Sequence, residues 1–454
     1  MDDKDRKTRS RLEALGADRL AEALYILARR NETVSAYVNM LLSPESESRE
    51  RIHNNLENLL CEDYFYNCYE SSDLAEQLAE IVDDILLNIM DPADGLALMK
   101  YFFETDALML EKCDDSNDYV ADVYEFQATD IFGSFAAAHK DKTLVADQAL
   151  TLYLQSEYGV RNNLIKHAEN YLPEPQLRQM VAALEAEVEA SDETNFSRQR
   201  ALEGIEMLAK QLKDPVLFEK TRLRITPDYT LKDCIDIARQ YHECSQNTNA
   251  LDWLQKSSVE PGWQEEKKDE LLYCIYLQEK NSAKAEEVAW RMFRRSRTKE
   301  RFERLITTIG EEHGEKILHD QATSLLNSNA FMLDDAVFLV DMGKIDEAAT
   351  YLVRWAEHLN GNCYYVYKSL ADEMEINGEH LAATVIYRAL LSEILNQGKN
   401  QAYQQGANYL HKLDVLAEKI EYWQTVPPHA VFTKELTTRH KRKWRFWKTY
   451  GKHP

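Results

Sequence analysis

Two consecutive stretches of the chain, residues 331–359 and 363–395, share one pattern that limits the fold more than any other. Each stretch reads as two amphipathic helices joined by a tight polar turn, MGKIDEA in the first and INGEHLA in the second. Gly343 and Gly378 hold equivalent places in these turns. Apolar residues at three- and four-residue spacing on both sides of such a turn are typical of helix-turn-helix repeats. The pattern therefore predicts an all-α protein.

The same spacing continues upstream of these two stretches. Polar breaks align at Asp214, Asn247, Asn281, Gly314, Gly343 and Gly378. Small or apolar residues follow three to five positions later, at Ala250 or Leu251, Ala285, Ala348 and Ala382. A period of about 34 residues, with small residues where two helices cross, is typical of tetratricopeptide repeats. The full consensus is absent, so residues 193–425 are predicted to form an α-helical solenoid of degenerate tetratricopeptide-like repeats.

Composition agrees with long helices joined by short links. The 454 residues include only 14 Gly and 10 Pro, fewer than the many turns of a β-sandwich or barrel require. No apolar run approaches the roughly 20 residues of a membrane span. The N-terminus, MDDKDRKTRSRLEAL, has no apolar core, so no secretory signal is expected. Seven scattered cysteines predict free thiols and a reducing, cytoplasmic setting.

The two ends of the chain differ in charge. Residues 43–130 contain 23 acidic and 4 basic residues, whereas residues 434–453 contain 8 basic and 1 acidic. Residues 1–192 are therefore predicted to form an acidic N-terminal helical domain, and residues 426–454 a basic, aromatic C-terminal helix. A solvated acidic face explains the asymmetry most simply. A salt-sensitive contact between the two ends, or separate basic and anionic partners, are the alternatives.

Five short segments together resemble a known family. They are LGADRLAEALYILA (15–28), CDDSNDYVADVYEF (113–126), QSEYGVRNNLI (155–165), GKIDEAATYL (343–352) and HKRKWRFW (440–447). The chain resembles a bacterial family known as domain of unknown function 6880, whose helical repeats are similar to those that follow the SWIM zinc-finger domain. The resemblance implies an all-helical protein and no assigned activity. The SWIM zinc motif itself is absent, because no Cys-x-Cys followed by Cys-x-His occurs.

An acidic turn is the strongest candidate for local chemistry. Asp114, Asp115, Asp118 and Asp122 place four carboxylates within nine residues. Such hard oxygen ligands suit magnesium or calcium, but the glycine and glutamate positions of an EF-hand loop are not matched. Capping by Asp115, Ser116 or Asn117 of a helix that starts near Asp118 is the first interpretation. An acidic patch that binds a partner is the second, and a metal or catalytic site is the third.

Two further groups of residues are candidates for binding. Lys441, Arg442, Lys443, Arg445 and Lys448 alternate with Trp444 and Trp447, and such a mixture can pair with phosphates and stack on bases. In the alternative interpretation, Trp444 and Trp447 form one helical face, with Phe446 slightly to the side, that caps the last repeat. Tyr364, Tyr365 and Tyr367 are candidates to line a concave groove, where aromatic side chains often dominate binding.

No catalytic motif accompanies these features. The sequence contains no G-x-S-x-G, no G-x-x-x-x-G-K-[ST] and no H-E-x-x-H. We therefore expect no cofactor, no metal and a non-catalytic scaffold or adaptor that binds a protein or peptide. One alternative is a nucleic-acid-associated defence or regulatory protein that uses the basic tail. The other is a metal-dependent enzyme that uses the carboxylates of residues 114–122.

Overall fold

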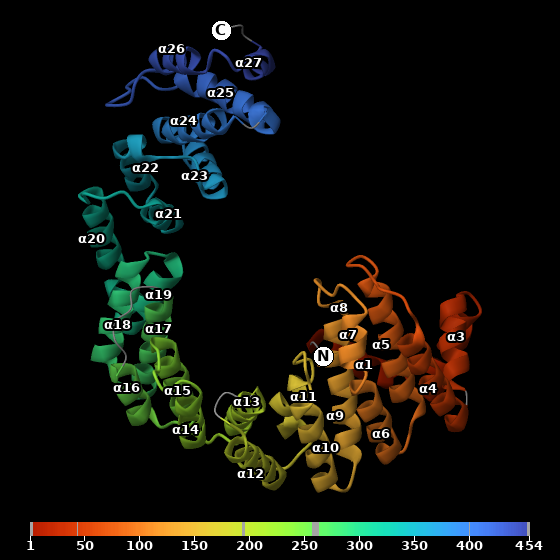
Figure 1. The fold of residues 1–454 in the computed structure, drawn as a ribbon. Coiled ribbons are helices and arrows are strands. Elements are labelled where there is room, and N and C mark those ends of the chain that lie inside the picture. The colour runs from red at the N-terminus through yellow and green to blue at the C-terminus, as the bar shows by residue number, and fades with distance from the viewer. Residues whose placement is uncertain (1–2, 43, 193–195, 257–262, 399, 452–454) are drawn as a thin grey trace. The chain divides into compact units, whose positions relative to one another are not determined.

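Helices form the secondary structure of the computed structural model, which describes residues 3–42, 44–192, 196–256, 263–398 and 400–451 (Figure 1). No strand occurs in these ranges; one isolated bridge joins Tyr66 and Cys113. The predicted all-α fold is confirmed. The chain divides into two units, Met1–Val259 and Glu260–Pro454. None of the described helices is both long enough and apolar enough to cross a membrane.

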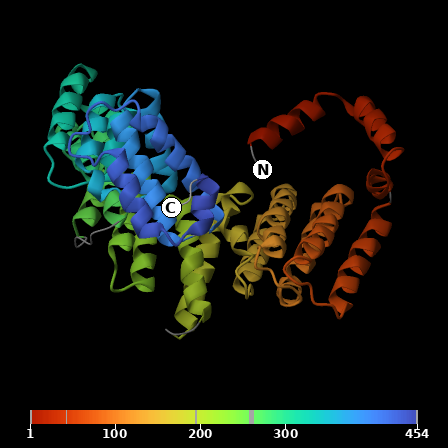
Figure 2. The same ribbon diagram turned by 90° about the horizontal axis from the view of Figure 1, so that it is seen from above.

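The first unit is a succession of helices, many of which pack against the next helix in the chain (Figures 1 and 2). They are α1 (Asp3–Glu13), α2 (Ala17–Ala28), α3 (Glu32–Leu41), α4 (Glu45–Cys61), α5 (Ser71–Asn88), α6 (Pro92–Phe103), α7 (Asp106–Glu111), α8 (Tyr119–Asp122), the π-helix η1 (Val123–Ala128), α9 (Thr129–Ala138), α10 (Lys142–Leu154), α11 (Asn162–Lys166), the 3-10 helix η2 (Ala168–Asn170), α12 (Glu174–Ala190), α13 (Phe196–Gln211), α14 (Pro215–Ile225), α15 (Leu231–Glu243) and α16 (Asn247–Lys256).

The second unit continues with antiparallel helix pairs stacked one after another (Figure 1). They are α17 (Trp263–Gln278), α18 (Ser282–Arg295), α19 (Lys299–Ile309), η3 (Glu311–His313), α20 (Gly314–Leu326), α21 (Leu333–Asp341), α22 (Ile345–Arg354), η4 (Ala356–His358), α23 (Tyr364–Ile376), α24 (His380–Gln397), η5 (Asn400–Ala402), α25 (Tyr403–Ala417), α26 (His429–His440) and α27 (Trp444–Tyr450). The predicted solenoid of tandem helix-turn-helix units is therefore present.

One turn geometry recurs at five of the six predicted breaks, all of which lie in the described chain. Lys213, Ser245, Lys280, Gly343 and Gly378 adopt positive φ between 51° and 82°. In each case the next residue donates its N–H to the carbonyl five positions earlier, as Lys344 does to Leu339 and Glu379 does to Met374, both at 2.8 Å. This is the Schellman pattern, which ends one helix and leads directly into the next.

The break predicted at Gly314 is different. Gly310 has φ 125°, η3 follows it, and Gly314 is the first residue of α20. The shared turn is therefore missing at this position, and a short 3-10 helix makes the connection. The small residues that follow the other breaks are placed as predicted, because Ala250, Ala285, Ala348 and Ala382 are all fully buried.

Some apolar side chains of the helices in the first unit are exposed. In α2, none of the described side chains is buried, and Leu24 and Leu27 face solvent. Phe126 is also exposed, while Val120 and Val123 of the same segment are buried. The cause is the π-helix η1, whose wider turn shifts the residues that follow Val123 relative to the packed face.

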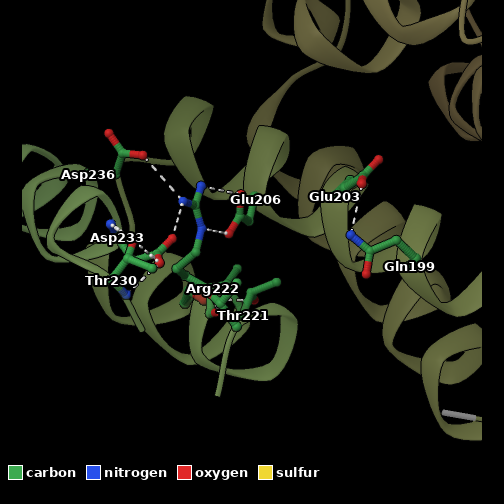
Figure 3. A network of polar contacts seen from close by, with 10 residues as sticks. Gln199, Glu203, Glu206, Thr221, Arg222, Thr230, Asp233 and Asp236 are labelled. Carbon is green, nitrogen blue, oxygen red and sulfur yellow. Dashed lines mark hydrogen bonds and ion pairs between the residues drawn. The ribbon is translucent and has the colours of Figure 1, made fainter. Parts of the chain in front are cut away.

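An arginine network joins three helices of the first unit. Arg222 of α14 donates hydrogen bonds to both carboxylate oxygens of Glu206 on α13, from Nε at 2.5 Å and from Nη2 at 2.8 Å. Its Nη1 donates to Asp233 and Asp236 of α15 at 3.0 and 3.3 Å (Figure 3).

The domain boundary proposed near residue 192 stays a prediction. The helices α12 and α13, which flank it, pack against each other in the first unit.

Candidate functional site: an acidic, aromatic surface in the first unit

Two loops far apart in the sequence are joined at one end of the first unit. We call the first, residues 62–70 between α4 and α5, the aromatic loop, and the second, residues 112–118 between α7 and α8, the acidic turn. Tyr66 donates its N–H to the Lys112 carbonyl at 2.9 Å, and Asp114 donates its N–H to the Tyr66 carbonyl at 2.8 Å. Asn117 Nδ2 adds a bond to the Cys68 carbonyl at 3.2 Å. These bonds hold the loops as one surface.

Lys112 fixes the same surface to α4. Its Nζ donates to the carbonyls of Leu59 and Leu60 at 2.7 Å and of Glu62 at 2.6 Å. Carbonyls at the end of a helix have no partner within the helix, so a lysine placed there satisfies them and complements the helix dipole. The only basic residue of the acidic turn is thus occupied inside the protein, and the carboxylates around it keep an uncompensated negative charge.

The four predicted aspartates do not share one role. Asp115 caps α8, because its two oxygens accept from the N–H groups of Val120 and Ala121 at 3.0 and 2.9 Å. Asp114, Asp118 and Asp122 are exposed. Asp118 adopts φ 59°, a left-handed conformation that turns the chain into α8. The capping interpretation thus describes Asp115, and the other three carboxylates face solvent.

Exposed aromatic rings lie on the same surface. The side chain of Phe65 is 60% exposed and that of Tyr69 is 88% exposed, while Tyr64 and Tyr119 are about half exposed. Tyr66 anchors the group from below, since it is buried and its hydroxyl donates to Glu62 at 3.0 Å. Clusters of exposed apolar side chains often mark interaction sites, and tyrosine is enriched where partners bind.

A cavity of about 510 Å³ opens between α4 and α5 beside the aromatic loop. Its lining includes the carboxylates of Glu62 and Glu80. The one cation in the lining, Arg51, is already held by both oxygens of Asp84 at 2.8 Å. The cavity therefore has the charge and polarity to accept a cationic side chain.

Cys113 is the cysteine at the centre of this surface. Burial, assisted by Asp115 and Asp114, raises the pKa of the Cys113 thiol to about 11, so this cysteine stays protonated and a weak nucleophile. Among the described residues, no group of three or more His, Cys, Asp or Glu side chains is arranged to hold a metal ion. The metal-dependent alternative thus finds no ligand set in the described chain.

The three candidate tyrosines of α23 are separated by the fold. Tyr365 is 86% exposed and Tyr364 is partly exposed, but Tyr367 is 1% exposed and belongs to the core of the second unit. Helical geometry explains the difference, since Tyr367 lies on the face opposite to Tyr365. Tyr367 cannot contact a partner, so it is removed from the candidate set.

The basic segment forms two helices instead of the single predicted helix, because the chain turns at residues 441–443 between α26 and α27. Phe446 and Trp447 are buried against α25, and Trp447 Nε1 donates to the His440 carbonyl at 3.0 Å. Trp444 is 61% exposed, so it does not share the packed face that was predicted for it. Lys441, Arg442, Arg445 and Lys448 are exposed, and Lys443 is partly buried.

Sequence reasoning missed the aromatic loop. The signal was present as CEDYFYNCYE, a run of acids and aromatic residues between two helices, but periodicity assigns no role to residues outside helices. The pairing of this loop with the acidic turn depends on contacts between residues about 47 positions apart, such as the bridge from Tyr66 to Cys113.

Comparison with known proteins identifies one sequence relationship. The model of the family of unknown function DUF6880 matches residues 7–223 and 226–449. No curated protein matches the chain. Among solved structures, a circular tandem repeat protein with novel repeat topology and enhanced subunit contact surfaces is 13% identical, over 95% of this chain and 94% of that chain. Its TM-score is 0.14, so this likeness supports no argument about fold, assembly or function.

Proposed function

Since this chain belongs to the family of unknown function DUF6880, we propose its function from its own surface: a non-catalytic adaptor that binds a basic segment of a partner protein. One observation carries the proposal. The aromatic loop and the acidic turn are hydrogen-bonded into a single surface on which exposed rings lie beside exposed carboxylates and a carboxylate-lined cavity.

The chemistry of this surface selects the partner. Exposed carboxylates attract lysine and arginine, and aromatic faces add cation–π contacts with the same groups. The cavity beside Glu62 gives one such side chain a place to enter. Because the loops are already held in place, binding loses little free energy to ordering them.

A labelled oligoarginine peptide of about ten residues tests the proposal by fluorescence anisotropy with the full chain. We expect binding that weakens as salt rises, and Tyr69→Ser should weaken it about tenfold, which corresponds to about 1.4 kcal/mol. Tyr365→Ser is the matched control, because Tyr365 is equally exposed but lies on α23. Equal binding by both variants, or no binding at low salt, would show that this surface is not the site.

A second candidate function is nucleic-acid binding through residues 441–448. The observation in its favour is the exposed Trp444 among exposed cations, with the Arg445 guanidinium 5.5 Å from its ring. A single-stranded oligonucleotide should then bind with a steep dependence on salt, and Trp444→Ser should weaken it. Deleting the segment is unsuitable, because α27 packs on α25. If the oligonucleotide does not bind in low salt, this function is excluded.

We also propose that the protein is cytoplasmic and that its repeats are tetratricopeptide-like. All seven cysteines are free, which suits a cytoplasmic protein. The five Schellman turns and the buried alanines that follow them favour divergent tetratricopeptide-like units.

A further inference from the structure

Arg388 of α24 is a buried cation with an unused hydrogen-bonding edge. The residue is 7% exposed. Its Nη1 donates to the Pro427 carbonyl at 2.7 Å, but Nε and Nη2 have no hydrogen-bond partner among the described residues. Buried donors without a partner are destabilising, and natural proteins rarely keep them. The free edge formed by Nε and Nη2 is therefore a place where a hydrogen-bond acceptor would bind.

Elsewhere in this chain the same edge holds a carboxylate. Nε and Nη2 of Arg51 bind the two oxygens of Asp84, both at 2.8 Å. Arg161 binds Asp106 in this way at 2.7 and 2.5 Å, and Arg222 binds Glu206. The two parallel N–H groups match a planar or tetrahedral oxyanion with two oxygens on one side. An oxyanion is thus the group that would complete Arg388.

The Arg388 guanidinium is buried between aromatic rings, where a bound anion would neutralise its charge. The Arg388 guanidinium lies 4.5 Å from the Phe432 ring and 5.0 Å from the Trp423 ring. Burial lowers the pKa of Arg388 to about 10, and the charge of Glu435 opposes this effect. Glu435 is itself exposed and makes no hydrogen bond to Arg388. The positive charge is therefore largely uncompensated.

The N-terminus of α26 follows directly after the carbonyl that Arg388 binds. Arg388 reaches the Pro427 carbonyl, one residue before the N-cap Pro428, which has no side chain able to cap the helix. The N–H groups of His429 and Ala430 have no acceptor in the described chain. The His429 side chain is held by Asp414, whose Oδ1 lies 2.9 Å from Nε2.

We propose that the guanidinium edge of Arg388 and the N-terminus of α26 form a binding site for a carboxylate or phosphate group. The helix dipole and free N–H groups favour an anion, and Arg388 supplies charge and two-point geometry. The Trp423 ring lies 5.0 Å from the guanidinium, close enough to sense a change in its surroundings. Its fluorescence therefore reports binding.

The test titrates the full chain with sodium phosphate and, separately, sodium acetate, with sodium chloride at equal ionic strength as the reference. We expect one of the two oxyanions to raise Tm saturably by about 2–4 °C and to change tryptophan emission, whereas chloride does neither. The better oxyanion identifies a phosphate or a carboxylate as the natural group. Arg388→Met should abolish the Tm rise, and Trp423→Phe should abolish the emission change.

Arg294→Met is the matched control, since Arg294 is an exposed arginine of the same unit and its loss should leave the effect intact. The proposal fails if neither oxyanion acts on the wild-type chain, or if a folded Arg388→Met variant still responds. It also fails if the response appears only in Glu435→Gln, because the internal carboxylate would then occupy the edge. The wild-type emission titration decides even if Arg388→Met does not fold.

Discussion

Buried arginines join neighbouring helices of this protein through two-point contacts with carboxylates. Arg161 and Asp106 are both almost fully buried, and Asp106 is the first residue of α7. A buried pair of this kind stabilises little relative to an apolar pair, but removing one partner leaves a charge in the core. These residues therefore fix which helices meet.

Arg222→Met tests this at the network in Figure 3. The substitution keeps most of the side-chain volume but leaves Glu206 and Asp233, both buried, without their cation. We expect a loss of about 3–5 kcal/mol in the free energy of unfolding, measured by urea denaturation. Arg178→Met is the control; Arg178 is exposed, and its loss should cost less than about 1 kcal/mol. Equal losses for the two variants would refute the role of the network.

The contributions of two buried aspartates to the free energy of unfolding should change with pH in opposite directions. At Asp233, burial alone would raise the pKa, but hydrogen bonds from Thr230 and Arg222 outweigh it and lower the pKa. At Asp335, burial dominates and raises the pKa despite Arg297, 2.9 Å away. The Asp233 carboxylate therefore stabilises at neutral pH, and its contribution is lost as pH falls through the lowered pKa. The Asp335 carboxyl contributes at low pH, and its contribution is lost as pH rises through the raised pKa.

Urea unfolding of Asp233→Asn and Asp335→Asn between about pH 3 and pH 7 measures both effects. The stability difference between wild type and Asp233→Asn should shrink as pH falls. The difference between wild type and Asp335→Asn should grow in the same direction. Parallel pH profiles for the two variants would contradict the assignment.

At the scale of elements, the repeated turn is the feature that organises the chain. Each Schellman turn needs one residue at positive φ, and the chain uses glycine at Gly343 and Gly378 but lysine or serine at three earlier turns. Only glycine adopts this conformation without steric cost. The non-glycine turns are thus weaker versions of one motif, which explains why the earlier repeats were harder to recognise.

Opposite substitutions at equivalent turns should change stability in opposite directions. Gly378→Ala introduces a methyl group with nothing within 4 Å, so its cost is backbone strain alone, about 1 kcal/mol. Lys280→Gly relieves the same strain at φ 56° and should stabilise by a few tenths to about 1 kcal/mol. Urea midpoints of both variants provide the measurement. Two shifts of the same sign would show that the turns are not equivalent.

At the scale of the molecule, each unit contains its own hydrophobic core. The first cluster runs from Ile52 to Leu208 and the second from Tyr273 to Tyr450. Each cluster belongs to one unit, so each unit has the means to fold by itself.

Separate expression of residues 1–259 and 260–454 tests this independence. Both fragments should be helical by circular dichroism and should unfold cooperatively on heating. A fragment cut at residue 192 divides the first core cluster, which extends to Leu208, and should be less stable than residues 1–259. If residues 1–259 remain unfolded alone while the full chain folds, the two cores are not independent.

The sequence alone determined that the chain is helical and where most helices turn, because helix spacing and turn residues are local properties. It also offered capping by Asp115 or a neighbour as the first interpretation of the acidic turn, and Asp115 does accept from the first N–H groups of α8. Only the tertiary structure decided that Lys112 donates its hydrogen bonds to the end of α4, that Tyr367 is buried and that Trp444 is exposed. It alone showed the aromatic loop beside the acidic turn and the free edge of Arg388. These properties depend on which distant segments pack together, and a helical period cannot specify that.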